Sequence, residues 1–150
     1  MIRLLNIREI GKYPLDETWV IVRSLKSPIK NTVQVKELSP SYELFIQYRQ
    51  LAEQNNWNRQ TFDEIYVPQF IREMQNPIAR ERLNELYLKE KQGLSIGLAC
   101  FCTDETMCHR SIVGGLLSGA GANVVTSTGN DYSHYYENYK EIKNTTELGF

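Results

Sequence analysis

Short apolar stretches separated by turn residues make up the start of the chain, and this pattern predicts β-strands. We expect a first strand over residues 3–7 and a stronger one over residues 18–23, Thr-Trp-Val-Ile-Val-Arg, because β-branched and aromatic side chains favour strands. Residues 24–31 carry two lysines and a proline, which predicts a loop. A brief extended piece is expected over residues 33–36.

The pattern then changes to apolar residues that recur every three or four positions, which predicts helices. We expect a first helix with Ser39 as its N-cap and Pro40 at its first position, where a missing N–H costs nothing. A second helix should begin near residue 58 and be kinked or split by Pro68. A third is expected over residues 77–92, closed by a glycine.

The last third of the chain predicts a strand, a helix and a second strand over residues 94–101, 106–117 and 122–127. Such a unit is a βαβ crossover, typical of a parallel sheet. We therefore predict one three-layer α/β domain, Rossmann-like, over residues 1–127. Residues 128–150 are polar and rich in tyrosine, and we expect them to pack on this domain or to extend from it.

Composition excludes several classes of protein. Hydrophobic residues make up 41% of the 150 and charged residues 23%, a globular balance, with a net charge of −1 that does not suit a protein that wraps duplex nucleic acid. No apolar run is long enough to cross a membrane, and the first residues do not resemble a secretory signal. All three cysteines lie between positions 100 and 108, which indicates a reduced, cytoplasmic chain and no disulfide framework.

The candidate chemistry is concentrated in residues 100–110, Cys-Phe-Cys-Thr-Asp-Glu-Thr-Met-Cys-His-Arg, between the buried strand and the next helix. Ligands of open α/β sheets bind at this edge, and a helix N-terminus offers unpaired N–H groups. Arg110 can add a planar set of donors suited to phosphate, and His109 can donate or accept a proton. Cys108 lies in the first turn beside both, which predicts a lowered thiol pKa.

Four interpretations of this turn remain open. The cysteines could be packing residues, which is our interpretation of Cys100 on its apolar strand. Cys100, Cys102, Cys108 and His109 could bind zinc, although the usual two-residue gaps between ligands are missing, and we therefore assign no metal and no cofactor. Cys108 or Cys102 could be a nucleophile with His109 as its base. The turn could also bind an anion without covalent chemistry.

The order of motifs resembles the domain of unknown function 488 family over residues 18–126. The resemblance rests on a buried strand that ends in cysteine before Cys-His-Arg at 108–110, on Leu-Ser-Pro-Ser at 38–41, and on Val-Arg-Ser at 22–24. The aromatic residues Trp57, Phe62 and Tyr66, in and just before the next predicted helix, support the resemblance. Ile21 departs from the family, because many members have an acidic residue before Val-Arg, and the tail also lies outside the pattern.

The resemblance implies a compact α/β domain whose site draws on the Cys-His-Arg turn, Arg23, Ser39, Ser41 and Tyr66. Related small domains, some of them phage-borne, suggest nucleotide-type ligands, so we expect a small phosphate-bearing molecule, such as a signal nucleotide that the protein sequesters. The alternatives are a thiol-dependent enzyme and a zinc-stabilised interaction module. We expect no duplex nucleic acid or membrane as partner, and a homo-oligomer is compatible with the sequence. The predicted ligand-binding residues are Arg110, His109, Cys108, Cys102, Thr103, Arg23, Ser24, Ser39, Ser41 and Tyr66.

Several of these residues also have simpler structural roles. Ser39 and Ser41 are expected as helix caps, and Tyr66 as a core residue at helical spacing, although its ring could also stack on a ligand base. Asp104 and Glu105 could cap the helix that follows them. The tyrosines of the tail, with His134, are expected to face solvent on an amphipathic segment.

Overall fold

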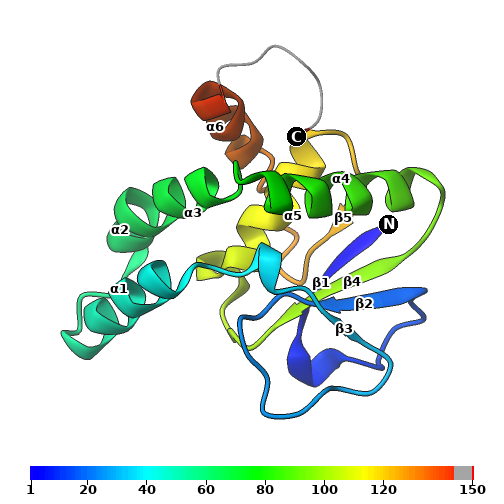
Figure 1. Ribbon diagram of the computed structural model, residues 1–150, viewed down its shortest axis with the longest axis horizontal. Coiled ribbons are helices and arrows are strands. Elements are labelled where there is room, and N and C mark those ends of the chain that lie inside the picture. The colour runs from blue at the N-terminus through cyan, green and yellow to red at the C-terminus, as the bar shows by residue number, and fades with distance from the viewer. Residues whose placement is uncertain (144–149) are drawn as a thin grey trace.

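The computed structural model describes residues 1–143 and 150, and its centre is a five-stranded sheet in which every neighbouring pair is parallel. The strand order is β3-β2-β4-β1-β5 (Figure 1). All five predicted strands are present, the first shifted by one residue and the other four shorter than expected, and the α/β class is confirmed. The strands are β1 (Ile2–Asn6), β2 (Glu17–Val20), β3 (Val33–Gln34), β4 (Ile96–Cys100) and β5 (Val124–Val125).

Both faces of the sheet are covered, which explains why β4 is buried at all five of its positions. On one face Leu4 of β1 lies against α5, where a Cβ added to Gly114 would be 3.0 Å from the Leu4 side chain. On the other face Leu5 and Leu15 lie over Gly97. The domain is therefore a three-layer, Rossmann-like arrangement with the thicker helical layer on the α5 side.

The helices form two groups. Figure 1 shows α4, α5 and α6 gathered on one side of the sheet, with α1, α2 and α3 extending away from it. The longer helices are α1 (Tyr42–Glu53), α3 (Val67–Glu73), α4 (Pro77–Lys91), α5 (His109–Gly119) and α6 (His134–Lys143). The short ones are η1 (Ile7–Glu9), η2 (Lys36–Leu38), α2 (Arg59–Thr61), η3 (Phe62–Tyr66) and η4 (Glu105–Met107).

Two predicted helix starts were wrong, each for a local reason, and one predicted interruption was right. Ser41, and not Ser39, is the N-cap of α1: its Oγ accepts from the Leu44 N–H at 3.1 Å. The expected break at Pro68 is present: the π-helical turn η3 precedes it, and the proline falls in the first turn of the next helix, α3. The helix expected from residue 106 begins at His109, because Asp104 caps the separate turn η4.

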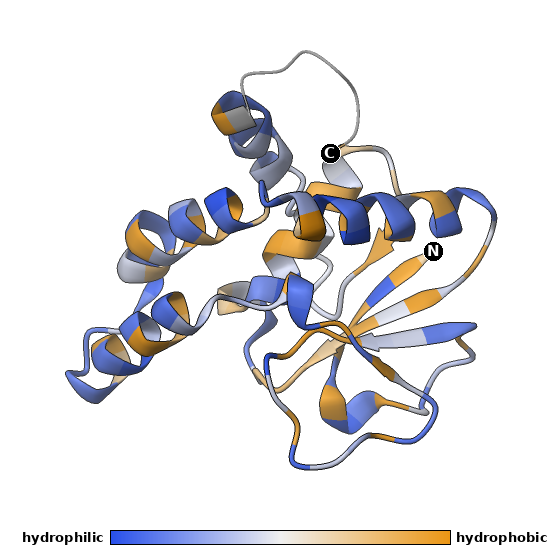
Figure 2. Cartoon of the chain, viewed as in Figure 1, coloured by the Kyte–Doolittle hydropathy of each residue, from blue (hydrophilic) through white to orange (hydrophobic). Residues whose placement is uncertain are grey.

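The tyrosine-rich segment is part of the core, so the expectation of a solvent-facing tail was wrong. Tyr132, Tyr135, Tyr136 and Tyr139 are all buried. The tail lies directly on α5, because a Cβ at Gly115 would be 2.1 Å from the Tyr132 carbonyl oxygen. Figure 2 shows that α5, between the tail and the sheet, is mostly hydrophobic.

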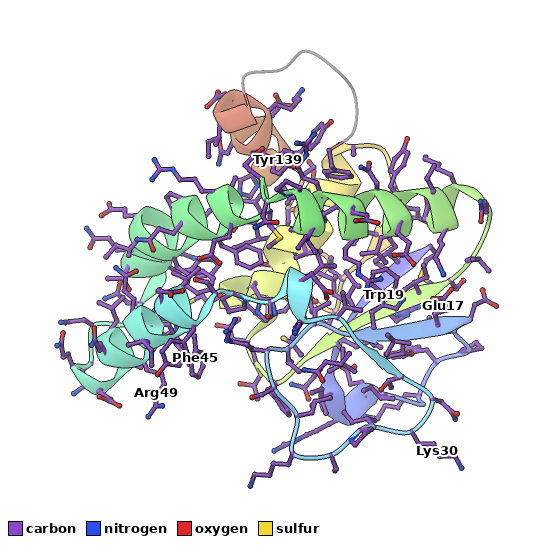
Figure 3. The ribbon with its side chains drawn as sticks, viewed as in Figure 1. Glu17, Trp19, Lys30, Phe45, Arg49 and Tyr139 are labelled. Atoms are coloured by element: carbon purple, nitrogen blue, oxygen red, sulfur yellow. The ribbon has the colours of Figure 1, made fainter. Side chains whose placement is uncertain are left out.

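Tyr139 connects α6 to the turn between α3 and α4. Its hydroxyl donates to the Met74 carbonyl at 3.2 Å, and the Gln75 side chain donates to the Tyr139 carbonyl at 3.0 Å. Figure 3 shows the labelled ring of Tyr139 between α6 and these helices. None of the helices in the described residues is both long and apolar enough to cross a membrane.

Candidate functional site

The three cysteines and His109 form one cluster where β4 ends and α5 begins. The three sulfur atoms and a ring nitrogen of His109 all lie within 4.8 Å of one another. Cys100 is the last residue of β4, Cys102 lies in the loop after it, and Cys108 is the N-cap of α5. Cys108 is extended, with φ −131° and ψ 147°. The adjacent residues Cys108 and His109 therefore both place their side chains in this cluster.

The ring of His109 is oriented by the backbone carbonyl of Ile21, the residue directly after β2. Its Nε2 lies 2.6 Å from the Ile21 carbonyl oxygen, just beyond β2. A carbonyl oxygen can only accept, so Nε2 carries the proton and Nδ1 presents its lone pair. Nδ1 lies 3.8 Å from the Cys108 sulfur. His109 therefore faces the cysteines with its unprotonated nitrogen.

Arg110 does not offer its donors to an outside anion, and this corrects our expectation. Its side chain is buried, with the residue 2% exposed. Nη1 donates to the Cys100 sulfur at 3.2 Å and to the Cys102 carbonyl at 2.7 Å. The arginine therefore acts inside the protein, where its positive charge stabilises sulfur anions and its hydrogen bond holds the loop.

The thiols differ strongly in acidity. Hydrogen bonds from the Cys102 and Cys108 thiols, with the nearby charge of Arg110, hold the pKa of Cys100 far below its usual range. Burial and the neighbouring sulfurs raise the pKa of Cys108 well above its usual value. The hydrogen bond between Cys102 and Cys100 raises the pKa of Cys102 to about 12. The predicted low pKa of Cys108 was wrong, because the low pKa falls on Cys100. Cys100 is fully buried in the hydrophobic core, as its apolar strand predicted.

A cavity of about 1390 Å³ opens at the carboxyl edge of the sheet, where β2 and β4 end. Most of the predicted binding residues line it, but Arg110 does not. A second cavity of about 430 Å³ shares Cys102 and His109 with the first. Thr103 and Cys108 line this smaller space. The predicted residues on the large cavity are Arg23, Ser24, Ser39, Ser41, Tyr66, Cys102 and His109.

Three of these predicted residues are already engaged within the protein. The hydroxyl of Ser39 donates to the Lys36 carbonyl at 2.6 Å, and that of Ser41 donates to the Glu73 carboxylate. The ring of Tyr66 stacks between Phe62 and Phe70, with centroids 5.6 and 6.1 Å away. Both serines and Tyr66 therefore shape the cavity wall, and Tyr66 is only 6% exposed.

Among the residues of the large cavity that were not predicted from the sequence are Tyr42, Phe45, Arg72 and Glu73. Tyr42 and Phe45 are three positions apart on α1 and so lie on the same side of the helix. Tyr42 is 57% exposed and Phe45 is 37% exposed. A large exposed aromatic pair on one helix face is a signal that could have found them.

The fold and the site define an α/β, Rossmann-like domain with a buried cysteine–histidine cluster beside a cavity at the carboxyl edge of its sheet. Residues 6–121 match the family described as the active DUF488-N3 subclade, DUF488-N3a. The chain belongs to the DUF488 family. No curated protein and no solved structure matches the chain.

Proposed function

We propose that the protein binds a small molecule that carries both an aromatic ring and a phosphate group, of the nucleotide class, in the large cavity. The observation that carries the proposal is that free guanidinium groups and exposed aromatic rings meet on its wall. Arg23 follows β2 and Arg72 lies on α3, and both line the cavity together with Tyr42 and Phe45. The proposal keeps the ligand class expected from the sequence but moves its anion contact from Arg110 to these two arginines.

The charge of the wall supports an anionic ligand. Within residues 1–143 and 150, neither Arg23 nor Arg72 forms an ion pair, whereas both acidic residues of the wall are engaged. Glu37 pairs with Arg82 at 3.6 Å, and Glu73 accepts from the Ser41 backbone N–H at 2.8 Å. The guanidinium groups of Arg23 and Arg72 are therefore available to a ligand, and a guanidinium matches the geometry of phosphate.

The exposed rings of α1 supply the surface on which a base would stack. Tyr42 lies next to Arg23, whose guanidinium carbon is 5.9 Å from its ring centroid. Figure 3 shows Phe45 on the same side of α1 as Arg49. Stacking on such rings is worth about 1–3 kcal/mol per base and tolerates any base. These rings would therefore favour ligands that carry a base, without selecting one base over another.

The thiol-dependent enzyme receives less support from this geometry. A nucleophile must be ionised and reachable, and these two properties fall on different cysteines. Cys100 has the low pKa but is fully buried, whereas the partly exposed Cys102 has its pKa raised to about 12.

The test is equilibrium binding of nucleoside monophosphates and diphosphates by calorimetry, with unphosphorylated nucleosides and inorganic phosphate as separate arms. We expect the phosphorylated nucleosides to bind most tightly, and Arg72→Gln and Tyr42→Ala each to weaken binding about tenfold, the loss of one charged or stacking contact. The control is Arg8→Gln, an exposed arginine that does not line the cavity. Binding of none of the nucleotides, or equal loss in the control, would refute the proposal.

A further inference from the structure

We propose that Cys100, Cys102, Cys108 and His109 together bind one zinc ion, as a structural Cys₃His centre under the cavity. This goes beyond the proposed ligand, which contacts other residues. It also replaces the expectation, drawn from ligand spacing, that the chain carries no metal. A two-residue gap is not needed here, because the ligands come from a strand end, the loop after it and a helix start.

The distances suit a tetrahedral site after small side-chain rotations. Sulfur atoms about 2.3 Å from zinc are separated by roughly 3.8 Å along the edge of the tetrahedron. Cys108 Sγ and His109 Nδ1 are 3.8 Å apart, and no two of the four donors are more than 4.8 Å apart. Cys100 and Cys108, whose sulfurs are 2.9 Å apart, must separate by roughly 1 Å to take tetrahedral positions.

His109 is already prepared as a ligand. Metal-binding histidines characteristically donate their second ring N–H to a carbonyl or carboxylate, which fixes both the tautomer and the ring plane. The Nε2 bond to the Ile21 carbonyl at 2.6 Å has this role, and it leaves Nδ1 free to bind the ion. Phe70 packs on the ring, with centroids 5.7 Å apart, and further limits its rotation.

The charges also balance with zinc in place. Three thiolates and one Zn²⁺ carry a net charge of −1, and the buried guanidinium of Arg110 supplies the opposite charge. Its Nη1 lies 3.2 Å from the Cys100 sulfur and so forms the outer-sphere hydrogen bond expected for a zinc-bound thiolate. Soft sulfur donors favour zinc over magnesium or calcium, which prefer oxygen ligands.

The neighbouring carboxylates are unavailable to the ion, which leaves the four sulfur and nitrogen donors as its ligands. Asp104 accepts from Thr106, and Glu105 accepts from Ser127, Thr128 and Tyr132. A site with four protein ligands is closed and typical of a structural zinc. It would hold the loop 101–107 between β4 and α5, and this loop borders both cavities through Cys102.

The first test uses the whole protein, purified in a non-thiol reductant and without chelators. Elemental analysis should find close to one zinc per chain, and X-ray absorption should show three sulfur neighbours and one nitrogen. Replacing the zinc by Co²⁺ should give thiolate-to-cobalt charge-transfer absorption. Absence of zinc together with failure of the reduced protein to bind added Zn²⁺ or Co²⁺ would overturn the proposal, as would a native disulfide between Cys100 and Cys108.

The second test asks whether these side chains hold the metal. His109→Gln keeps a donor for the Ile21 carbonyl but lacks Nδ1, so it should fold and yet lose zinc affinity by more than the roughly 10–100-fold typical of an outer-sphere change. Cys102→Ser should act alike. The matched control is His134→Gln, which removes the only other histidine, an exposed one, and should leave zinc content unchanged. Full zinc binding by the folded His109→Gln and Cys102→Ser variants would contradict the assignment.

Discussion

The backbone carbonyl of Ile21 lies 2.6 Å from Nε2 of His109, 88 residues further along the chain. Through this contact the end of β2 sets the orientation of a side chain at the start of α5. The backbone oxygen, which any residue at position 21 would supply, holds the ring here.

This contact predicts different costs for two substitutions of His109. His109→Phe fills the ring volume but leaves the Ile21 carbonyl buried without a donor, whereas His109→Gln can still donate to it. Both lack Nδ1, so their difference isolates this hydrogen bond. We expect the phenylalanine variant to be less stable than the glutamine variant by about 1–3 kcal/mol in urea unfolding. Equal stability would show that the contact contributes nothing.

Arg110 is predicted to be required for stability. Arg110→Met removes the buried charge beside the sulfurs and the hydrogen bond to the Cys102 carbonyl, so we expect a loss of about 3 kcal/mol in chemical unfolding. Arg49→Met is the control, since the Arg49 side chain is 57% exposed and contacts Glu53 and the Phe45 ring on its own helix. The control should change stability by no more than about 0.5 kcal/mol. Similar small effects of both changes would mean that Arg110 is dispensable.

Glu105 should make the attachment of the tail dependent on pH. Its side chain is buried and accepts from Ser127, Thr128 and Tyr132. Although burial alone would raise the pKa of this carboxyl group, these hydrogen bonds together outweigh it and lower the pKa below the usual 4.5. The stabilisation is therefore fully present above that value and is lost as the pH falls through the lower folded-state pKa.

We accordingly expect Glu105→Gln to be less stable than the native chain by about 2 kcal/mol at pH 7, with the difference shrinking below the usual glutamate pKa. Thermal unfolding of the two proteins across the acid range measures it. A difference that stays constant from neutral pH to well below pH 4 would contradict the role of the ionised carboxylate.

Gly115 should be intolerant of any side chain, because the tail backbone crosses it. A Cβ there would be 2.1 Å from the Tyr132 carbonyl oxygen, so Gly115→Ala must displace the tail. We expect a loss above about 2 kcal/mol, despite a gain of nearly 1 kcal/mol in helix propensity.

The neighbouring Gly114→Ala is the comparison for this substitution. Its Cβ would be 3.0 Å from the side chain of Leu4, which can rotate, and not from a backbone atom. It should therefore cost clearly less in the same unfolding experiment. A Gly115 variant as stable as the Gly114 variant would mean that the tail does not rest on α5 in solution.

The class of fold was predictable because the pattern of side chains responds to local geometry. Apolar runs at 18–23 and 94–101 became β2 and β4, and the periodic segment after Pro77 became α4. The boundaries were less predictable, since two serines near α1 were equally good caps. The chain uses Ser41, whose hydroxyl also bonds to Glu73 on α3, and a contact between distant helices leaves no trace in local sequence.

The amino-acid order was enough to locate the chemistry at the turn between β4 and α5, because the sulfurs and His109 lie within ten residues of one another. It did not reveal that Arg110 points inward, that Cys100 is the acidic thiol, or that the tyrosines of the tail are buried. Each of these depends on which distant groups remove water from the side chain or donate to it. Such surroundings arise only when β2, α1 and the tail pack around the turn in the folded protein. The electrostatic energies of the Arg110 and Cys100 side chains depend on that packing.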